Sequence, residues 1–208
     1  MTKAVFVTLL MCLGVLAGIT LATIVPTPQK RAPIEWLDNP RSLQQFTLEG
    51  IEGAVNNDSL TGQWTVLLFG FLHCADVCPT NLSQLAALEK QLSRSAVGGT
   101  IHYVFVSVDP QRDSVAAVDD YAKHFAASIR GVTGNADELE RLAADLGVQF
   151  NVIDDDENYT VSHSVTYSLI GPEGDLRARF RPGFDAGGLA SAITAALNQA
   201  ATSNGRRS

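Results

Sequence analysis

Blocks of apolar and polar positions along the chain predict strands and helices in alternation. Residues 64–71 form an almost unbroken apolar run rich in aromatic and branched side chains, which predicts a central strand covered on both faces. Residues 81–93 then place leucines at helical spacing, and Pro79 suits a first helical turn because that position needs no amide donor. The alternation continues with a strand over residues 101–108, a helix over residues 114–127 and a short strand over residues 129–132.

The second half of the chain adds a helix, a hairpin and a closing helix. Asn135 can cap a helix that stops at Gly147. Residues 161–170 and 176–180 predict a hairpin around a Gly-Pro-Glu-Gly turn, and residues 188–200 predict the last helix. This order, a βαβ half followed by a helix, a hairpin and a helix, is typical of an α/β thioredoxin-like domain, here with an insertion.

The predicted domain covers residues 44–200 and begins with a short hairpin at the sheet edge, over residues 46–60. Residues 4–25 carry no charge, and at ~1.5 Å per residue such a stretch can reach across a ~30 Å hydrocarbon core. We therefore expect one uncleaved transmembrane helix over residues 1–25, since a signal peptide has a shorter apolar region and a small-residue exit. Prolines indicate an extended linker over residues 26–43, and a disordered tail is expected over residues 201–208.

Charge and cysteine content narrow the possible functions. The chain has 15 basic and 22 acidic residues, which give a net charge of −7. Because a negative protein repels the phosphate backbone, no nucleic-acid partner is expected. Of the 3 cysteines, Cys12 lies in the apolar N-terminal run and is interpreted as a small hydrophobe. Cys74 and Cys78 are then expected to serve redox or metal chemistry, with an inert local disulfide as the alternative.

Cys74 and Cys78 are predicted to lie at a helix start, where residues four apart share a face and the helix N-terminus favours thiolates. A thioredoxin-type redox motif has two intervening residues and faces a cis-proline. Here three residues intervene, no proline occurs between Gly131 and Gly171, and a later predicted strand carries His163 instead. Two thiolates and an imidazole suit Cu(I) and also permit Cu(II), whereas zinc would ordinarily require a fourth ligand. Cys74, Cys78 and His163 are the predicted metal ligands.

Three blocks of sequence carry a family resemblance: GFLHCADVCP at residues 70–79, VSVDPQRD at residues 106–113, and VSHS at residues 161–164 with Tyr167. Together they resemble the Sco/SenC copper chaperones. The resemblance implies a single-pass protein of the bacterial inner membrane with its domain in the periplasm. It also implies a role in metallating the dinuclear copper site of cytochrome c oxidase subunit II, with Cys74, Cys78 and His163 as the copper ligands.

One position departs from the family pattern. Members often carry aspartate immediately before the histidine, where this chain has Ser162. If that carboxylate orients the imidazole, the metal affinity of this chain is expected to differ.

Other polar residues near the three blocks are interpreted structurally. His73 is expected to diverge from its neighbour Cys74, and Asp76 to favour the helix start rather than lend an oxygen to Cu(II). Asp109 and Asp113 flank a proline and are expected to shape a turn, with Asp113 capping the next helix. Residues 154–157 are expected to form a solvated acidic loop, with partner docking as a secondary hypothesis.

Four functions remain open. The leading hypothesis is a metallochaperone that transfers copper by ligand exchange and is no enzyme. Its partners would be subunit II and possible periplasmic copper carriers or thiol reductants. The alternative is a thiol-disulfide oxidoreductase that uses Cys74 and Cys78 to reduce the target's cysteines before metallation. A peroxidase and a copper sensor are weaker options.

Overall fold

The computed structural model describes residues 33–155 and 158–204. The predicted transmembrane helix lies outside these residues. Within the two described ranges, no helix has both the length and the apolar character needed to cross a membrane.

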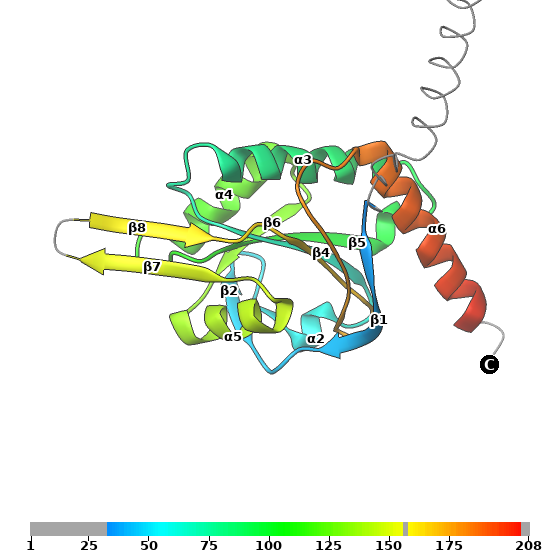
Figure 1. Ribbon diagram of the computed structural model, residues 1–208, viewed down its shortest axis with the longest axis horizontal. Coiled ribbons are helices and arrows are strands. Elements are labelled where there is room, and N and C mark those ends of the chain that lie inside the picture. Colours follow the sequence, from blue (N-terminus) through cyan, green and yellow to red (C-terminus); the bar gives the residue numbers. More distant parts are fainter. Residues whose placement is uncertain (1–32, 156–157, 205–208) are drawn as a thin grey trace, which may run out of the picture. The chain divides into compact units, whose positions relative to one another are not determined.

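A mixed sheet of eight strands, in the order β1-β10-β9-β4-β5-β6-β2-β3, forms the centre of the domain (Figure 1). The central pairs β4–β5 and β5–β6 are parallel, and β9 pairs with β4 in the antiparallel sense. The strands are β1 (Glu35–Ser42), β2 (Thr47–Gly50), β3 (Val55–Asn56), β4 (Trp64–Gly70), β5 (Ile101–Ser107), β6 (Ile129–Thr133), β9 (Tyr167–Ile170) and β10 (Asp175–Phe180).

Helices cover both faces of this sheet, which explains the unbroken apolar run of β4. Val66 and Leu68 pack into one core cluster, and Leu67 and Phe69, which alternate with them, pack into the other. The first cluster includes residues of α3 (Val77–Leu92), α4 (Val115–Phe125) and α6 (Ala186–Asn204). The second includes residues of α2 (Asn57–Leu60) and α5 (Ala136–Leu146). A short 3₁₀ turn, Gly98–Thr100, precedes β5.

Several predicted boundaries are confirmed together with their local causes. Asn135 caps the start of α5, because its side chain accepts a hydrogen bond from the amide of Glu138. Gly147 ends the helix in the left-handed region, at a φ of 66°. The N-terminal hairpin exists as β2 and β3, at the sheet edge as expected. It runs directly into α2, whose start is closed by reciprocal bonds between Asn56 and Ser59.

The segment predicted as an extended linker contains a strand, so that part of the prediction is wrong. Strand β1 (Glu35–Ser42) pairs antiparallel with β10 at the edge of the sheet. Pro40 is compatible with this strand because the register shifts between Trp36 and Arg41, and prolines are tolerated at sheet edges and bulges. At the other end, α6 continues to Asn204, so residues 201–204 of the predicted disordered tail are helical.

The strand predicted over residues 161–170 is in fact two strands. Residues from 167 onward form β9 in the main sheet, while β8 (Asn158–His163) pairs with β7 (Phe150–Asp155) in a separate two-stranded sheet. Asp154 and Asp155 therefore belong to a strand, which corrects the predicted acidic loop at these two residues, whereas residues 156–157 lie outside the described residues. Figure 1 shows this hairpin reaching out beyond the main sheet.

Candidate metal centre

The cysteine half of the site follows directly from the central strand. Strand β4 ends at Gly70, a loop carries Cys74, and α3 begins one residue before Cys78. Cys74 is half-buried, whereas the side chain of Cys78 is buried. Only Cys78 is helical, so the expectation that both cysteines share a helix face is wrong in detail. The pair is nevertheless in contact, because the amide of Cys78 donates to the Sγ atom of Cys74 at 3.3 Å.

Gly70 allows the Cys78 sulfur to lie over the end of the central strand. A Cβ atom at this position would lie 3.2 Å from Cys78 Sγ and 2.5 Å from a ring carbon of Phe105. Such close approach leaves no room for a larger residue without displacing the sulfur or the ring. Asp76, the N-cap of α3, makes no side-chain capping bond, so its role at the helix start is at most electrostatic.

The histidine half comes from the two-stranded hairpin. His163 ends β8, and its Nε2 lies 3.6 Å from the Sγ atom of Cys78. Its Nδ1 lies 3.2 Å from the carbonyl oxygen of Ser164. When Nδ1 donates its proton to that carbonyl, the lone pair of Nε2 faces the sulfur, which is the arrangement a metal ligand needs. The ring also packs edge-on against Phe71, with centroids 5.8 Å apart.

Burial sets the protonation of both groups. Burial, together with the neighbouring Cys74 side chain, raises the pKa of Cys78 from 9.0 to about 12. Burial lowers the pKa of His163, and its bond to the Ser164 carbonyl opposes this only in part. At neutral pH the metal-free site therefore holds a neutral imidazole and a protonated Cys78 thiol. A thiophilic cation must displace that proton, so its binding is expected to depend on pH.

Ser162 does not contact the imidazole in the way proposed for the family's aspartate. Its side chain is exposed and lies on the opposite face of β8 from His163, because successive residues of a strand alternate. The orienting partner of the imidazole is the main-chain carbonyl of Ser164. Substitution at residue 162 is therefore compatible with an oriented histidine.

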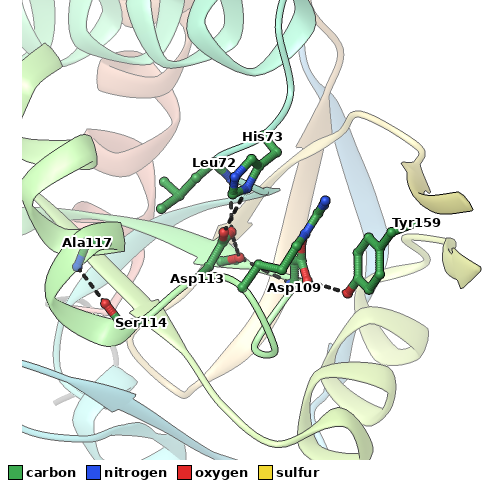
Figure 2. A network of polar contacts seen from close by, with 9 residues as sticks. Leu72, His73, Asp109, Asp113, Ser114, Ala117 and Tyr159 are labelled. Carbon is green, nitrogen blue, oxygen red and sulfur yellow. Dashed lines mark hydrogen bonds and ion pairs between the residues drawn. The ribbon is translucent and has the colours of Figure 1, made fainter. Parts of the chain in front are cut away.

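The turn from Asp109 to Asp113 contacts both halves of the site (Figure 2). Asp113 is buried, and its Oδ2 accepts bonds from the amide of Leu72 at 2.9 Å and the hydroxyl of Ser107 at 2.6 Å. The prediction that Asp113 caps the next helix is wrong. Ser114 caps α4 by accepting the amide of Ala117, which leaves Asp113 free to hold the loop that leads to Cys74.

Asp109 connects the same turn to the hairpin. Its Oδ1 accepts the hydroxyl of Tyr159 at 2.5 Å, and its Oδ2 accepts Nε and Nη2 of Arg112, each at 2.6 Å. The guanidinium carbon of Arg112 also lies 3.9 Å from the centre of the Tyr159 ring. Sequence reasoning missed Tyr159 and Arg112. The signal available was the spacing of Tyr159 and His163, which places both on one face of a strand.

His73, Asp109 and Asp113 bring potential ligand atoms within 4.8 Å of one another. Figure 2 shows His73 facing Asp113, and its Nδ1 lies 3.6 Å from Asp113 Oδ1. The side chain of His73 is exposed. Both carboxylate oxygens of Asp109 already accept bonds, and Arg112 neutralises its charge. This cluster therefore fits a cation less well than the thiols and imidazole do, and His73 keeps the structural role expected for it.

A groove of about 850 Å³ lies beside His163. One side is formed by α5 and the turn after it, and the other by the base of the β7–β8 hairpin. Ser162, His163 and Ser164 line it, whereas neither cysteine does. An incoming molecule can thus approach the site from the imidazole side.

Comparison with known proteins identifies the family. The family model SCO1/SenC matches residues 37–198. A curated protein of Stutzerimonas stutzeri named "Putative copper-binding protein" is 34% identical over 161 residues, covering 76% of this chain and 78% of that protein. SCO1 homolog 1 of Arabidopsis thaliana mitochondria is 34% identical over 146 residues, which cover 70% of this chain but only 43% of that longer protein.

Solved structures agree with this assignment and with the thioredoxin-like fold. Arabidopsis thaliana ScoI with copper bound has a TM-score of 0.67 at 33% identity, covering 75% of this chain and 98% of that chain. Yeast Sco1 with copper bound has a TM-score of 0.67 at 30% identity, covering 76% and 90% of the respective chains. With its mixed sheet, its paired cysteines and its hairpin histidine, the chain belongs to the SCO1/SenC family.

Proposed function

We propose that this protein is a copper metallochaperone. It binds one copper ion through Cys74, Cys78 and His163 and delivers it to the dinuclear copper site of cytochrome c oxidase subunit II. The observation that carries the proposal is the position of His163 Nε2, 3.6 Å from the Cys78 sulfur with Nδ1 occupied by a carbonyl. The relatives whose structures contain copper support the choice of metal.

The chemistry follows from the three side chains. Cu(I) prefers a soft set with few ligands, and two thiolates with one imidazole provide it. Each thiol that binds copper loses its proton, and the Cys78 amide already donates toward the Cys74 sulfur. Copper then moves by ligand exchange, in which thiolates of the acceptor replace those of the chaperone one at a time. No bond to copper needs to break before another has formed, so the ion is never released as the free aquated cation.

The proposed membrane anchor rests on the N-terminal sequence, and the proposed orientation rests on the function of the metal site. The uncharged residues 4–25 would anchor the chain in the inner membrane, with the domain in the periplasm where subunit II presents its copper site. Other periplasmic copper carriers would supply the ion, and a thiol reductant would keep both cysteines reduced.

An anaerobic Cu(I) titration of the purified full chain tests the ligand set. One tightly bound equivalent is expected, and His163→Ala should weaken binding at least about tenfold because one of three ligands is lost. His102→Ala is the matched control, since this histidine is exposed on β5, and it should bind as the wild type does. Equal affinity of wild type and His163→Ala would exclude the three-ligand site.

A second candidate function, thiol-disulfide oxidoreductase, is favoured by the unequal burial of the two cysteines. Half-exposed Cys74 would attack a target disulfide as the thiolate, forming a mixed disulfide and releasing one target thiolate. Buried Cys78 would then attack the Cys74 sulfur, releasing the second target thiolate and leaving Cys74 and Cys78 joined. Two electrons pass to the target. Because burial keeps the pKa of Cys78 at about 12, the second step is expected to be slow at neutral pH.

The two functions separate in a transfer assay with the reduced and the oxidised copper-binding domain of subunit II. A chaperone loads the reduced domain with copper, whereas a reductase without copper restores the thiols of the oxidised domain. In cells, deletion should lower oxidase activity and added copper should restore it. Disulfide reductase activity that survives His163→Ala, without copper transfer, would favour the second function.

A further inference from the structure

One face of β8 carries three side chains that all point toward the domain. Tyr159, Val161 and His163 are half-buried, whereas Thr160 and Ser162 between them are exposed. Val161 packs against the core cluster that also receives Cys74. The inward face thus attaches the strand at three points, and only the last of these is the metal ligand.

Tyr159 makes the most elaborate of these attachments. Its hydroxyl donates to the buried carboxylate of Asp109 at 2.5 Å, and the guanidinium of Arg112 lies over its ring while binding the other oxygen of that carboxylate. Figure 2 shows Tyr159 turned toward Asp109. A hydrogen bond to a charged group combined with a cation–π contact is a strong and directional anchor.

The same turn also holds the cysteine loop. Asp113 binds the amide of Leu72, two residues before Cys74, and the amide of Asp113 donates to the carbonyl of Asp109 at 2.9 Å. The five-residue turn from Asp109 to Asp113 is therefore in direct contact with both arms of the site, the loop that carries Cys74 and the hairpin that carries His163.

The hairpin depends on such an anchor. Within residues 33–155 and 158–204, β7 and β8 pair only with each other and with none of the eight strands of the main sheet. A two-stranded hairpin is marginally stable alone in water. At its base the hairpin is held by the chain that continues into β9 and by the amide of Ser164, which donates to the carbonyl of Gln149 at 2.8 Å. Along the rest of β8, its position relative to the domain depends on side-chain contacts such as that of Tyr159.

We propose that Tyr159 is a positioning residue for the metal ligand His163, and that Asp109 and Arg112 hold it in place. This inference rests on the proposed copper-binding function, but it concerns how the imidazole is brought to the thiols. The turn from Asp109 to Asp113 sets the separation of the two arms, and loss of the Tyr159 hydroxyl lets the hairpin move away from Cys78.

The test compares Tyr159→Phe with Tyr103→Phe in the full chain. Tyr103 is a matched control because its buried hydroxyl has no hydrogen-bond partner within the described residues. Tyr159→Phe should lower Cu(I) affinity roughly tenfold and alter the electron paramagnetic resonance spectrum of bound Cu(II), as expected when an outer partner of a ligand is lost. Tyr103→Phe should leave both unchanged.

Two further measurements keep the inference falsifiable. Arg112→Lys retains the positive charge but loses the planar guanidinium that stacks on the Tyr159 ring, and should lower Cu(I) affinity about threefold. This variant tests the inference even if Tyr159→Phe folds poorly. In the metal-free protein, Tyr159→Phe should shift the ring resonances of His163 and speed amide exchange along β7 and β8. Unchanged affinity, spectrum and exchange in both variants would overturn the inference. A wild type that binds no copper, with the metal-free shifts present, would overturn only the proposed function.

Discussion

The candidate metal centre has two arms, a thiol arm with Cys74 and Cys78 and an imidazole arm with His163, and they differ in what holds them. Cys78 lies in the first turn of α3, and its buried sulfur belongs to a core cluster beside the end of the central strand of an eight-stranded sheet. His163 is carried by a two-stranded hairpin whose outward residues are exposed, with Ile153 exposed by 47%. The thiol arm is therefore fixed by the hydrophobic core, whereas the imidazole arm is fixed by a few polar and aromatic contacts. A site built in this way can change the position of one ligand without unfolding the domain.

The largest effect on stability is expected from a substitution at Gly70, which lies beside the Cys78 sulfur in the thiol arm. Gly70→Ala forces the Cys78 sulfur or the Phe105 ring to move, and should lower the free energy of unfolding by about 2 kcal/mol through overpacking. Chemical denaturation of the metal-free protein measures this loss, and copper affinity should fall with it. Gly99→Ala serves as the control, because a Cβ atom there meets no other atom within 4 Å. Equal stability of the two variants would mean that Gly70 does not shape the thiol arm.

A smaller effect should appear in the pH dependence of stability. Because the pKa of Cys78 rises from 9.0 to about 12 on folding, the folded state keeps a thiol proton that the unfolded chain loses above pH 9. The stabilisation is complete below pH 9 and is lost as the pH rises toward 12. Between pH 9 and 10 the free energy of unfolding should fall by up to about 1 kcal/mol.

Cys78→Ser is the reference for this measurement, since serine does not titrate in that range. Urea denaturation of the reduced, metal-free proteins at pH 7.5, 9 and 10 should show a steeper decline for the wild type. Parallel curves would show that Cys78 titrates normally and that the thiol arm is more open than its burial indicates.

The smallest effect is expected at Ser162. Ser162→Asp introduces the residue common in the family, but on the exposed face of β8 opposite the imidazole. A surface charge of this kind is worth about 0.5 kcal/mol, so Cu(I) affinity should change by no more than roughly twofold. Competition titration against a chromogenic chelator checks this. A tenfold tightening would show that a carboxylate at this position, and not the Ser164 carbonyl, orients His163.

The sequence predicted the elements of the thiol arm better than those of the imidazole arm. Strand β4 and helix α3 were visible because a doubly covered strand and a helix packed on it leave an unbroken apolar run followed by leucines at helical spacing. Strand β7 was missed because its six residues combine three apolar side chains with an acidic end that resembles a solvated loop, and β1 was missed because Pro40 argued against a strand.

The three candidate ligands were identified from residue type and spacing, but their supports were not. Asp113 binds an amide 41 residues away, and Tyr159 binds a carboxylate 50 residues away. Periodicity reports which face of an element is apolar. It gives no information on which polar groups meet when two distant segments come together.

The turn from Asp109 to Asp113, which contacts both arms, also bears on which positions of the domain can accept substitutions. Asp109 contacts the hairpin and Asp113 contacts the cysteine loop, and the two residues share one backbone hydrogen bond. Lineages that adapt the site to another acceptor therefore have little freedom in this turn. Exposed positions on the outward face of β8, such as Thr160, should instead accept substitutions without changing the distance between sulfur and nitrogen.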